Sequence, residues 1–192
     1  MKKPFNHFSA LAPKYEAYIK PNLPEKLLSL INLPIQGRIL DAGGGTGRVS
    51  QFLRNKSARI VIADQSLPML REAKRKEGLQ PICTDSETLP FPENTFERIM
   101  MVDALHHVNH QQQTADELWR VLKPGGRIVI EEPDIRKFGV KLLALAEKIA
   151  LMRSHFLAPE QIAQLFSSPL ASSRFENDGA TAWIIIEKRT GC

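Results

Sequence analysis

Cysteine is scarce in this chain, and long apolar runs are absent. The 192 residues include two cysteines, Cys83 and Cys192, which make no metal-ligand spacing and no obvious disulfide. The sequence therefore favours a reducing compartment, and we expect Cys83, inside a predicted strand, to be a small core residue. No apolar stretch approaches the length of a membrane span, and Lys2 and Lys3 precede no apolar run. We thus predict neither secretion nor membrane insertion, but a cytoplasmic protein.

Two common nucleotide-binding motifs are also missing. Counting Gly-x-Gly-x-x-Gly from Gly43 places the third glycine at Arg48, and counting from Gly44 places the second at Thr46. The dinucleotide fingerprint therefore fails, and no Gly-Lys-Ser/Thr ending indicates a triphosphate loop. The sequence contains no internal repeat and no low-complexity segment.

Basic residues outnumber acidic ones, 26 to 21, for a formal net charge of +5. Arg71, Lys74, Arg75 and Lys76 fall on one predicted helix, a pattern that can contact phosphates. No aromatic residues interleave with these charges and no recognition module accompanies them, so a solvated helix face explains them better. The charge pattern argues against a nucleic-acid partner.

The most informative segment is a short apolar strand that ends on Asp41 and leads into glycines at positions 43, 45 and 47. In an open α/β sheet a ligand binds where such a strand ends. Glycine lets the backbone approach that ligand because it has no Cβ and adopts positive φ. We expect a helix to begin near Thr46 and to direct its N–H groups and positive dipole end at the same place. An anionic group should bind there.

Strands and helices alternate along the chain. Apolar strands are predicted near residues 38–41, 59–63, 80–83, 98–103 and 127–131, with helices between them. This alternation indicates an α/β fold with a parallel sheet and right-handed crossovers. Further helices are expected at about 24–31, 137–153 and 159–166, and a hairpin of 173–177 and 182–188 around Asn177-Asp178-Gly179. The length fits a single domain, residues 1–192.

Two more carboxylates follow predicted strands. Asp64 ends the second strand, where doubly wound folds place an acid for ribose hydroxyls. Ser66 is expected to cap the next helix, with Pro68 in its first turn. Asp85 follows the third strand. The apolar side of the capped helix should carry Met69, Leu70 and Ala73.

The D-x-G-x-G-x-G motif at 41–47 resembles the first motif of class I S-adenosylmethionine (SAM) dependent methyltransferases. The segments Leu89–Val108 and Leu122–Glu132 are similar to the branch that includes the ubiquinone and menaquinone C-methyltransferases, and the motifs occur in order from Phe5 to Glu132. The resemblance implies a Rossmann-like fold: a mostly parallel seven-stranded sheet, helices on both faces, and a C-terminal hairpin whose second strand lies antiparallel beside the fifth. Glu97 replaces the branch's usual Asp at what we interpret as a strand start. After Glu132 the resemblance fades. The resemblance therefore implies less about the identity of the substrate than about that of the cofactor.

SAM is the cofactor that this resemblance implies, with S-adenosylhomocysteine as product, and no metal is expected. In the family the acid at Asp85 takes the adenine amino group, and Ser86 offers its backbone N–H to the ring. The cofactor-binding residues expected on this basis are Asp41, Ala42, Gly43, Gly45, Gly47, Asp64, Gln65, Met69, Asp85, Ser86, Asp103 and Ala104.

His106 and His107 follow the fourth strand, where the methyl acceptor should lie. They are the candidate catalytic residues because histidine suits a general base at neutral pH. A base is needed only if the acceptor must lose a proton, since positioning and exclusion of water can supply most of the acceleration. In the alternative, one histidine packs against the next helix and the other is a solvated loop residue.

Two segments outside the motifs are assigned to the substrate side. Residues 1–22, with Phe8, Tyr15 and Tyr18, are expected to form a lid over the cofactor or to cover a sheet edge. Residues 133–172 are expected to supply substrate-side helices.

The predicted helix over Phe138–Met152 is strongly apolar, with Lys137, Lys141 and Lys148 on one side. Such a helix could rest on a membrane surface as a peripheral contact. We expect instead an ordinary core helix with a lysine face.

The sequence therefore predicts SAM-dependent methyl transfer to a small, partly apolar acceptor, quinol- or phenol-like. Apolar side chains after Glu132 favour a hydrophobic ring over a polyanion; they are Phe138, Leu142, Leu143, Leu145, Ile149 and Phe156. One alternative is an RNA or protein methyltransferase, although the chain lacks an Asn/Asp-Pro-Pro-Tyr motif after the fourth strand and a Pro-Cys nucleophile. The other is a SAM-binding protein without catalysis, which the binding motifs do not exclude.

Overall fold

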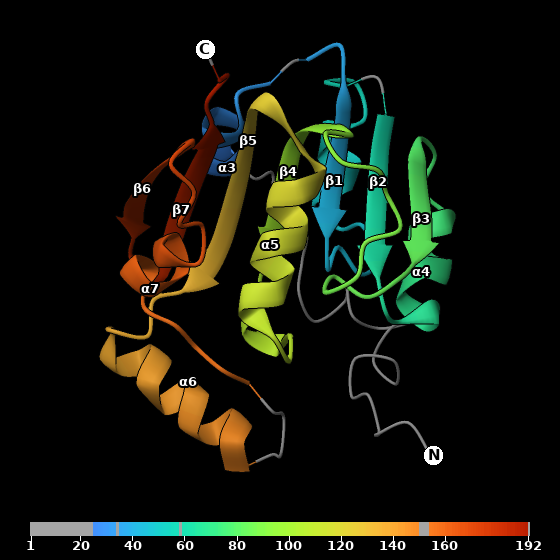
Figure 1. The fold of residues 1–192 in the computed structure, drawn as a ribbon. Coiled ribbons are helices and arrows are strands. Elements are labelled where there is room, and N and C mark those ends of the chain that lie inside the picture. Colours follow the sequence, from blue (N-terminus) through green and yellow to red (C-terminus); the bar gives the residue numbers. More distant parts are fainter. Residues whose placement is uncertain (1–24, 34, 58, 150–153, 192) are drawn as a thin grey trace.

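A single seven-stranded sheet organises the chain, with strand order β3-β2-β1-β4-β5-β7-β6 (Figure 1). The computed structural model describes residues 25–33, 35–57, 59–149 and 154–191. The strands are β1 (Arg38–Ala42), β2 (Arg59–Asp64), β3 (Leu79–Cys83), β4 (Phe96–Val102), β5 (Leu122–Pro133), β6 (Ala171–Asp178) and β7 (Thr181–Lys188). β1 to β5 pair in parallel, and β7 pairs antiparallel with β5 and with β6. The expected Rossmann-like fold and its inserted hairpin strand are confirmed.

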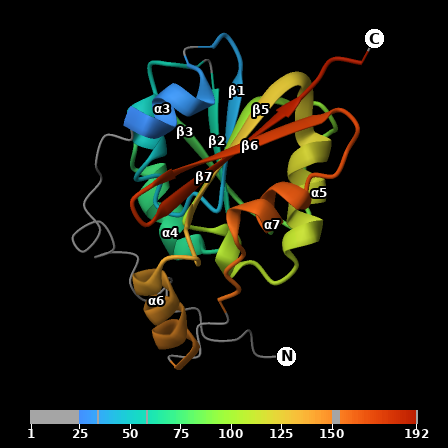
Figure 2. The same cartoon turned by 90° about the vertical axis from the view of Figure 1, so that its left-hand side faces the viewer.

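Helices cover both faces of the sheet. α5 (Gln111–Val121) and α7 (Pro159–Gln164) lie on one face, and α3 (Glu25–Ile31), α4 (Leu67–Lys74) and the 3₁₀ turn η2 (Ser50–Leu53) lie on the other (Figures 1 and 2). A second 3₁₀ turn, η3 (Leu105–His107), follows β4, and α6 (Phe138–Ile149) follows β5. The expected lid residues Phe8, Tyr15 and Tyr18 lie outside the described residues.

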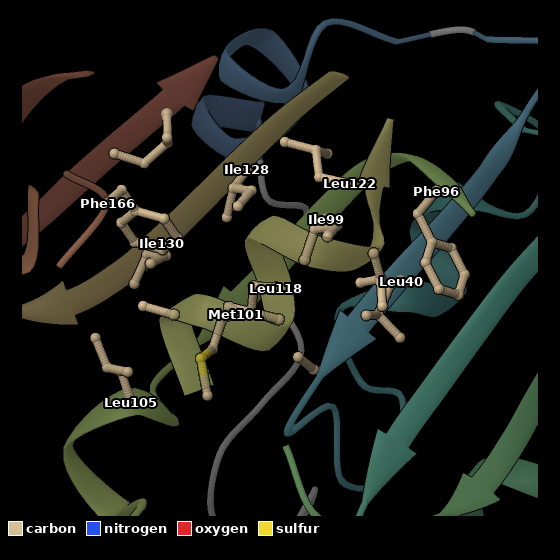
Figure 3. Packing of buried hydrophobic residues seen from close by; sticks show 14 of the residues in the cluster. Leu40, Phe96, Ile99, Met101, Leu105, Leu118, Leu122, Ile128, Ile130 and Phe166 are labelled. Carbon is tan, nitrogen blue, oxygen red and sulfur yellow. The ribbon is translucent and has the colours of Figure 1, made fainter. Parts of the chain in front are cut away.

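The two cores follow from the alternation of side chains along each strand. Leu40 and Met101 belong to the core under α5, whereas their chain neighbours Ile39 and Met100 belong to the core on the opposite face. Figure 3 shows the first of these cores, with Leu118 of α5 packed against the sheet. A central parallel strand buried on both faces must be apolar at consecutive positions. This requirement explains why the central strands were recognisable as short apolar runs.

The local signals around α4 act as predicted. The Ser66 hydroxyl caps the helix by accepting a hydrogen bond from the Met69 N–H at 3.4 Å, and Pro68 lies in the first turn. Met69, Leu70 and Ala73 are buried, and Arg71, Lys74 and Arg75 are exposed. Arg71, Lys74 and Arg75 therefore form a solvated face, as the sequence indicated, but Lys76 does not, because it lies beyond the end of α4, is half-buried and donates a hydrogen bond to the Thr46 carbonyl oxygen at 2.6 Å.

The helix expected to begin near Thr46 does not form, so that prediction is wrong. Gly43, Gly45 and Gly47 have φ values of 71°, 53° and 71°, and a right-handed helix requires negative φ at consecutive residues. The segment after the turn forms only the four-residue 3₁₀ turn η2, together with a hydrogen bond from the Gln51 N–H to the Gly47 carbonyl oxygen at 3.1 Å. The helix-dipole argument for an anion site at this turn therefore fails.

The prediction that the helix after β5 is a core helix is also wrong. In α6, Val140 is buried, but Phe138 is 77% exposed, Leu142 53% and Leu145 55%. Figures 1 and 2 show α6 beyond the carboxyl ends of the parallel strands, clear of the sheet. Apolar periodicity shows that one face of a helix is apolar, but it does not show that another element covers that face. α6 ends at Ile149, and residues 150–153 of the predicted helix lie outside the described residues.

Cys83 is exposed and free, which corrects its assignment to the core. It ends β3, the edge strand of the sheet, where β2 is the neighbouring strand. Its thiol lies 3.7 Å from the Gln65 carbonyl oxygen. An edge strand is covered less completely than a central one, so a residue near its end can remain in contact with solvent.

Candidate methyltransferase site

Asp41 supports the glycine turn from inside the protein. Its side chain is buried, and the Ser50 hydroxyl donates a hydrogen bond to Asp41 Oδ2 at 2.7 Å. A Cβ on Gly44 would lie 2.5 Å from the Asp41 carboxyl carbon, so only glycine fits there. Burial raises the pKa of Asp41 to about 7, against the lowering effect of the Ser50 hydrogen bond.

The turn leaves room for a ligand at one of its glycines. A Cβ at Gly43 would lie 2.6 Å from Ala104 Cβ, and one at Gly47 would lie 2.7 Å from Ile62 Cδ1. At Gly45, by contrast, the one atom within 4 Å of such a Cβ is Asp64 Oδ2, at 3.8 Å. Among the atoms that the structure describes, Gly45 therefore faces open space beside the Asp64 carboxylate.

Asp64 presents a preorganised carboxylate to that space. Its Oδ2 accepts a hydrogen bond from the Gly45 N–H at 2.9 Å, and its Oδ1 accepts one from the Ser66 N–H at 2.7 Å. Burial raises the pKa of Asp64, while the two backbone hydrogen bonds lower it. Each carboxylate oxygen has two lone pairs, so each can also accept a hydrogen bond from one hydroxyl of a vicinal diol. The geometry fits the ribose of SAM.

Several of the residues expected to bind the cofactor, among them Asp85 and Ser86 for the adenine, lie together near the ends of β2 and β3. Gln65 Nε2 donates a hydrogen bond to Asp85 Oδ1 at 3.2 Å, and Asp85 Oδ1 also accepts the Glu87 N–H at 3.2 Å. Ser86 and Met69 are buried. The sheet therefore brings Asp64, Gln65 and Asp85 to the same carboxyl edge, as the sequence predicted.

The loop after β4 meets the glycine turn from the other side. Asp103 has a φ of 51°, its N–H donates to the Glu131 carbonyl oxygen at 3.0 Å, and its carboxylate lies 3.2 Å from Arg48 Nη2. Burial, followed by the charge of Asp103, raises the pKa of Glu131 to about 7. Sequence reasoning placed Asp103 and Ala104 here but missed Arg48 and Glu131.

His106 is a buried residue paired with a carboxylate. Its Nδ1 lies 2.5 Å from Glu132 Oε2, while Glu132 Oε1 accepts the N–H groups of Ala104 at 3.1 Å and Leu105 at 2.8 Å. The His106 ring stacks on Phe156 with a centroid distance of 4.4 Å. Glu132 was not singled out from the sequence; the signal available was its place at the end of the fifth strand, beside the loop after the fourth.

His107 is half-buried, so the alternative of a solvated loop histidine is wrong. Its ring centroid lies 3.9 Å from that of His106, and Ser154 Oγ is 3.3 Å from its Nδ1. Burial, with a further contribution from His106, lowers the pKa of His107 to about 3. His107 is therefore neutral at physiological pH and a weaker base than an ordinary histidine.

Among the described residues the protein has neither a metal-binding cluster nor a membrane-spanning helix. Within this part of the chain, no three His, Cys, Asp or Glu side chains are grouped so that they could hold a metal ion. No helix among the same residues has the length and apolar character needed to cross a membrane.

Comparisons with known proteins find methyltransferases among the proteins that this chain is similar to. A family model described as a methyltransferase domain matches residues 40–130. A demethylmenaquinone methyltransferase from Clavibacter sepedonicus is 33% identical over 155 residues, which cover 78% of this chain and 61% of the relative. The ubiquinone/menaquinone biosynthesis C-methyltransferase UbiE of Coxiella burnetii is 39% identical over 106 residues, covering 50% and 42%. This chain thus spans less than two thirds of either relative.

Solved structures show the same fold at low sequence identity. The methyltransferase of Haloferax volcanii in complex with the Trm112 methyltransferase activator has a TM-score of 0.81 at 14% identity, covering 98% of this chain and 100% of that one. A SAM-dependent methyltransferase from Aquifex aeolicus has a TM-score of 0.72 at 16% identity, covering 95% and 97%. Over residues 40–130 the chain therefore matches a methyltransferase domain, and over its aligned regions it is similar to the quinone methyltransferases of both relatives.

Proposed function

We propose that this protein transfers the methyl group of SAM to a small, partly apolar acceptor of the quinol or phenol type. The main evidence that the cofactor is SAM is the position of the Asp64 carboxylate. The N–H groups of Gly45 and Ser66 hold this carboxylate beside the open space at the glycine turn. The similarity to demethylmenaquinone and ubiquinone/menaquinone methyltransferases supports the acceptor half. SAM supplies an electrophilic methyl group on a sulfonium centre that is a good leaving group.

The residues along the carboxyl edge have distinct binding roles in this proposal. Asp64 accepts the two ribose hydroxyls, Asp85 accepts the adenine amino group, and the Ser86 N–H donates to the ring. The remaining residues shape the turn and the walls of the cofactor site: Asp41, Ala42, Gly43, Gly45, Gly47, Gln65, Met69, Asp103 and Ala104.

We assign the general-base role to His106 rather than to His107. A Nδ1–H bond to Glu132 would hold the ring in the tautomer whose Nε2 accepts a proton, and removing a phenolic proton increases electron density on the acceptor. His107 has a pKa lowered to about 3 and is poorly suited to this task. We expect His106→Ala to lower turnover about a hundredfold at neutral pH while SAM affinity stays nearly constant.

The control for that assignment is His107→Ala, which should retain most of the turnover. Glu132→Gln should shift the acidic limb of the pH–rate profile, because the amide stabilises the protonated imidazole less than a carboxylate does. Equal turnover in wild type, both single histidine variants and the double variant would show that positioning alone suffices.

The exposed face of α6 supports a peripheral contact with an anionic membrane that holds a lipophilic acceptor. Phe138, Leu142 and Leu145 share one side of the helix because they are spaced by four and three residues, and Lys137 and Lys141 are exposed nearby. In this proposal the helices of residues 133–172 stand on the substrate side. Vesicle co-sedimentation should show binding to anionic but not zwitterionic vesicles, lost in Leu142→Glu and kept in the control Leu170→Glu, whose site is 41% exposed.

The test of the whole function is transfer from methyl-labelled SAM to a short-chain demethylmenaquinol, with bulk tRNA, rRNA and cell protein as competing acceptors. We expect label in the quinol. Label in RNA or protein would establish the alternative methyltransferase function, and SAM binding with no transfer from extract-supplied acceptors would establish a non-catalytic protein. The free, exposed thiol of Cys83 supports the reducing, cytoplasmic location that we propose for this activity.

A further inference from the structure

A row of charged side chains crosses the sheet near the amino ends of the parallel strands, at the edge opposite the glycine turn. Arg98 of β4 pairs with Arg127 of β5, and Arg127 pairs with Glu187 of β7. Directly opposed residues of neighbouring strands point to the same face of a sheet. Arg98 also pairs with Ile39, whose side chain belongs to the core under α3 and α4. The row therefore lies on the α3 face, and Figure 1 shows α3 at this edge, with α6 beyond the opposite one.

This row lines a cavity of about 280 Å³ that carries an excess of positive charge. Arg189, which follows β7 and is exposed, lines the same cavity. Arg98, Arg127 and Arg189 against the single carboxylate of Glu187 leave two positive charges unbalanced. Lys188 also lines the cavity but is not counted, because its Nζ already donates three hydrogen bonds.

The two central guanidinium groups are held in place by backbone carbonyls. Arg98 Nε donates to the Ile31 carbonyl oxygen at 2.8 Å, and Arg127 Nη1 donates to the Leu30 carbonyl oxygen at 2.6 Å. A guanidinium group has five N–H donors, and these bonds use only part of them. Among the described residues, none accepts a hydrogen bond from Arg98 Nη2 or from Arg127 Nε. Fixed donors therefore remain for a ligand.

The two guanidinium groups also repel each other. Burial, followed by the charge of Arg127, lowers the pKa of Arg98, against the raising effect of Glu97 and Glu187. An anion bound between the two groups would offset this repulsion. Solvent reaches the place, since the side chains of Arg127 and Glu187 are 20% and 45% exposed.

We propose that this cavity binds a small, doubly charged oxyanion of the phosphate class, held by Arg98 and Arg127 with Arg189 at the rim. The planar fork of arginine suits such oxygens because it can donate two parallel hydrogen bonds. A single-stranded nucleic acid would be expected to stack its bases on aromatic side chains, and none of the residues that line the cavity is aromatic. The ligand is therefore free phosphate or a small phosphate monoester. The site is separate from the proposed function, because it lies at the other edge of the sheet from the cofactor residues.

Calorimetry at constant ionic strength and pH 8 tests the site, with inorganic phosphate and phenyl phosphate as probes. We expect one phosphate site in the wild-type protein. Arg98→Gln should weaken the affinity for both probes by about tenfold to a hundredfold. Glu187→Gln should strengthen it, because the competing carboxylate is removed. The matched control is Arg59→Gln, at an exposed arginine that begins β2, which should leave both affinities unchanged.

A further variant covers the case in which Arg98→Gln disturbs the fold. Arg189→Gln replaces an exposed side chain and should weaken both probes by about twofold to fivefold. S-adenosylhomocysteine affinity should stay constant in every variant, so that a failure of this site is distinguishable from a failure of the proposed function. Absence of phosphate binding to the wild-type protein, or affinities that do not differ between Arg98→Gln, Arg189→Gln and Arg59→Gln, would overturn the proposal. Displacement of phenyl phosphate by a short single-stranded RNA would also overturn it and assign the cavity to nucleic acid.

Discussion

Replacing Asp41 by Asn should remove a pH-dependent contribution that Asp41 makes to the free energy of unfolding. The Asp41 carboxyl is buried beneath the glycine turn, and burial raises its pKa from 3.8 to about 7. The native state therefore holds a proton on Asp41 between these two values, while the unfolded chain does not. A state that binds the extra proton becomes less stable as pH rises, so wild-type stability falls through this window and levels off above about pH 7.

The expected change in the free energy of unfolding follows from the pH range that is compared. From pH 5 to pH 8 the native carboxyl passes through the upper two units of its shift, which corresponds to about 3 kcal/mol at 1.36 kcal/mol per unit. Asn cannot ionise, and its amide oxygen can still accept the Ser50 hydroxyl hydrogen bond. Any constant cost of the substitution cancels when the two pH values are compared.

Urea unfolding at pH 5 and pH 8 measures this difference directly. We expect the free energy of unfolding of Asp41→Asn, relative to wild type, to increase by about 3 kcal/mol between the two pH values. Asp116→Asn, at an exposed carboxylate on α5, is the control and should follow wild type. Parallel pH dependence of wild type and Asp41→Asn would refute the reasoning, because it would mean that the carboxyl ionises in the native state at no cost.

Three further predictions concern backbone, cofactor and acceptor. Gly47→Ala should lower the free energy of unfolding in urea by about 2–3 kcal/mol, since φ is 71° and the added Cβ would lie 2.7 Å from Ile62 Cδ1. The control Gly179→Ala, at a positive φ with open space around it, should lower it by about 1 kcal/mol. Asp64→Ala should weaken SAM binding by about 1.5–3 kcal/mol in calorimetry, and NAD should not bind; tight NAD binding or an unchanged SAM affinity would contradict the ribose role. The acceptor KM should change little between low and moderate salt, whereas steep salt-dependent loss would indicate phosphate contacts and an RNA acceptor.

The sequence by itself determined the parts of this protein that depend on local pattern. Consecutive apolar residues identified the central strands, because strands buried on both faces need them. Ser66 and Pro68 marked the start of α4, since a hydroxyl cap and a fixed φ act within one turn. The order of acids at strand ends indicated Asp64 and Asp85, because parallel strands place their carboxyl ends at one edge of the sheet.

Only the tertiary structure decided which side chains meet across that edge and which faces are covered. Glu132 reaches His106, and Arg48 reaches Asp103, across 26 and 55 positions of sequence, through contacts set by strand register and not by local spacing. The helix expected near Thr46 does not form, because Gly45 and Gly47 adopt positive φ values. The sequence could not show this, since glycine permits that conformation without requiring it. The apolar side of α6 is exposed because amphipathicity encodes a face but not its partner, and whether a partner surface lies opposite is settled when the whole chain packs.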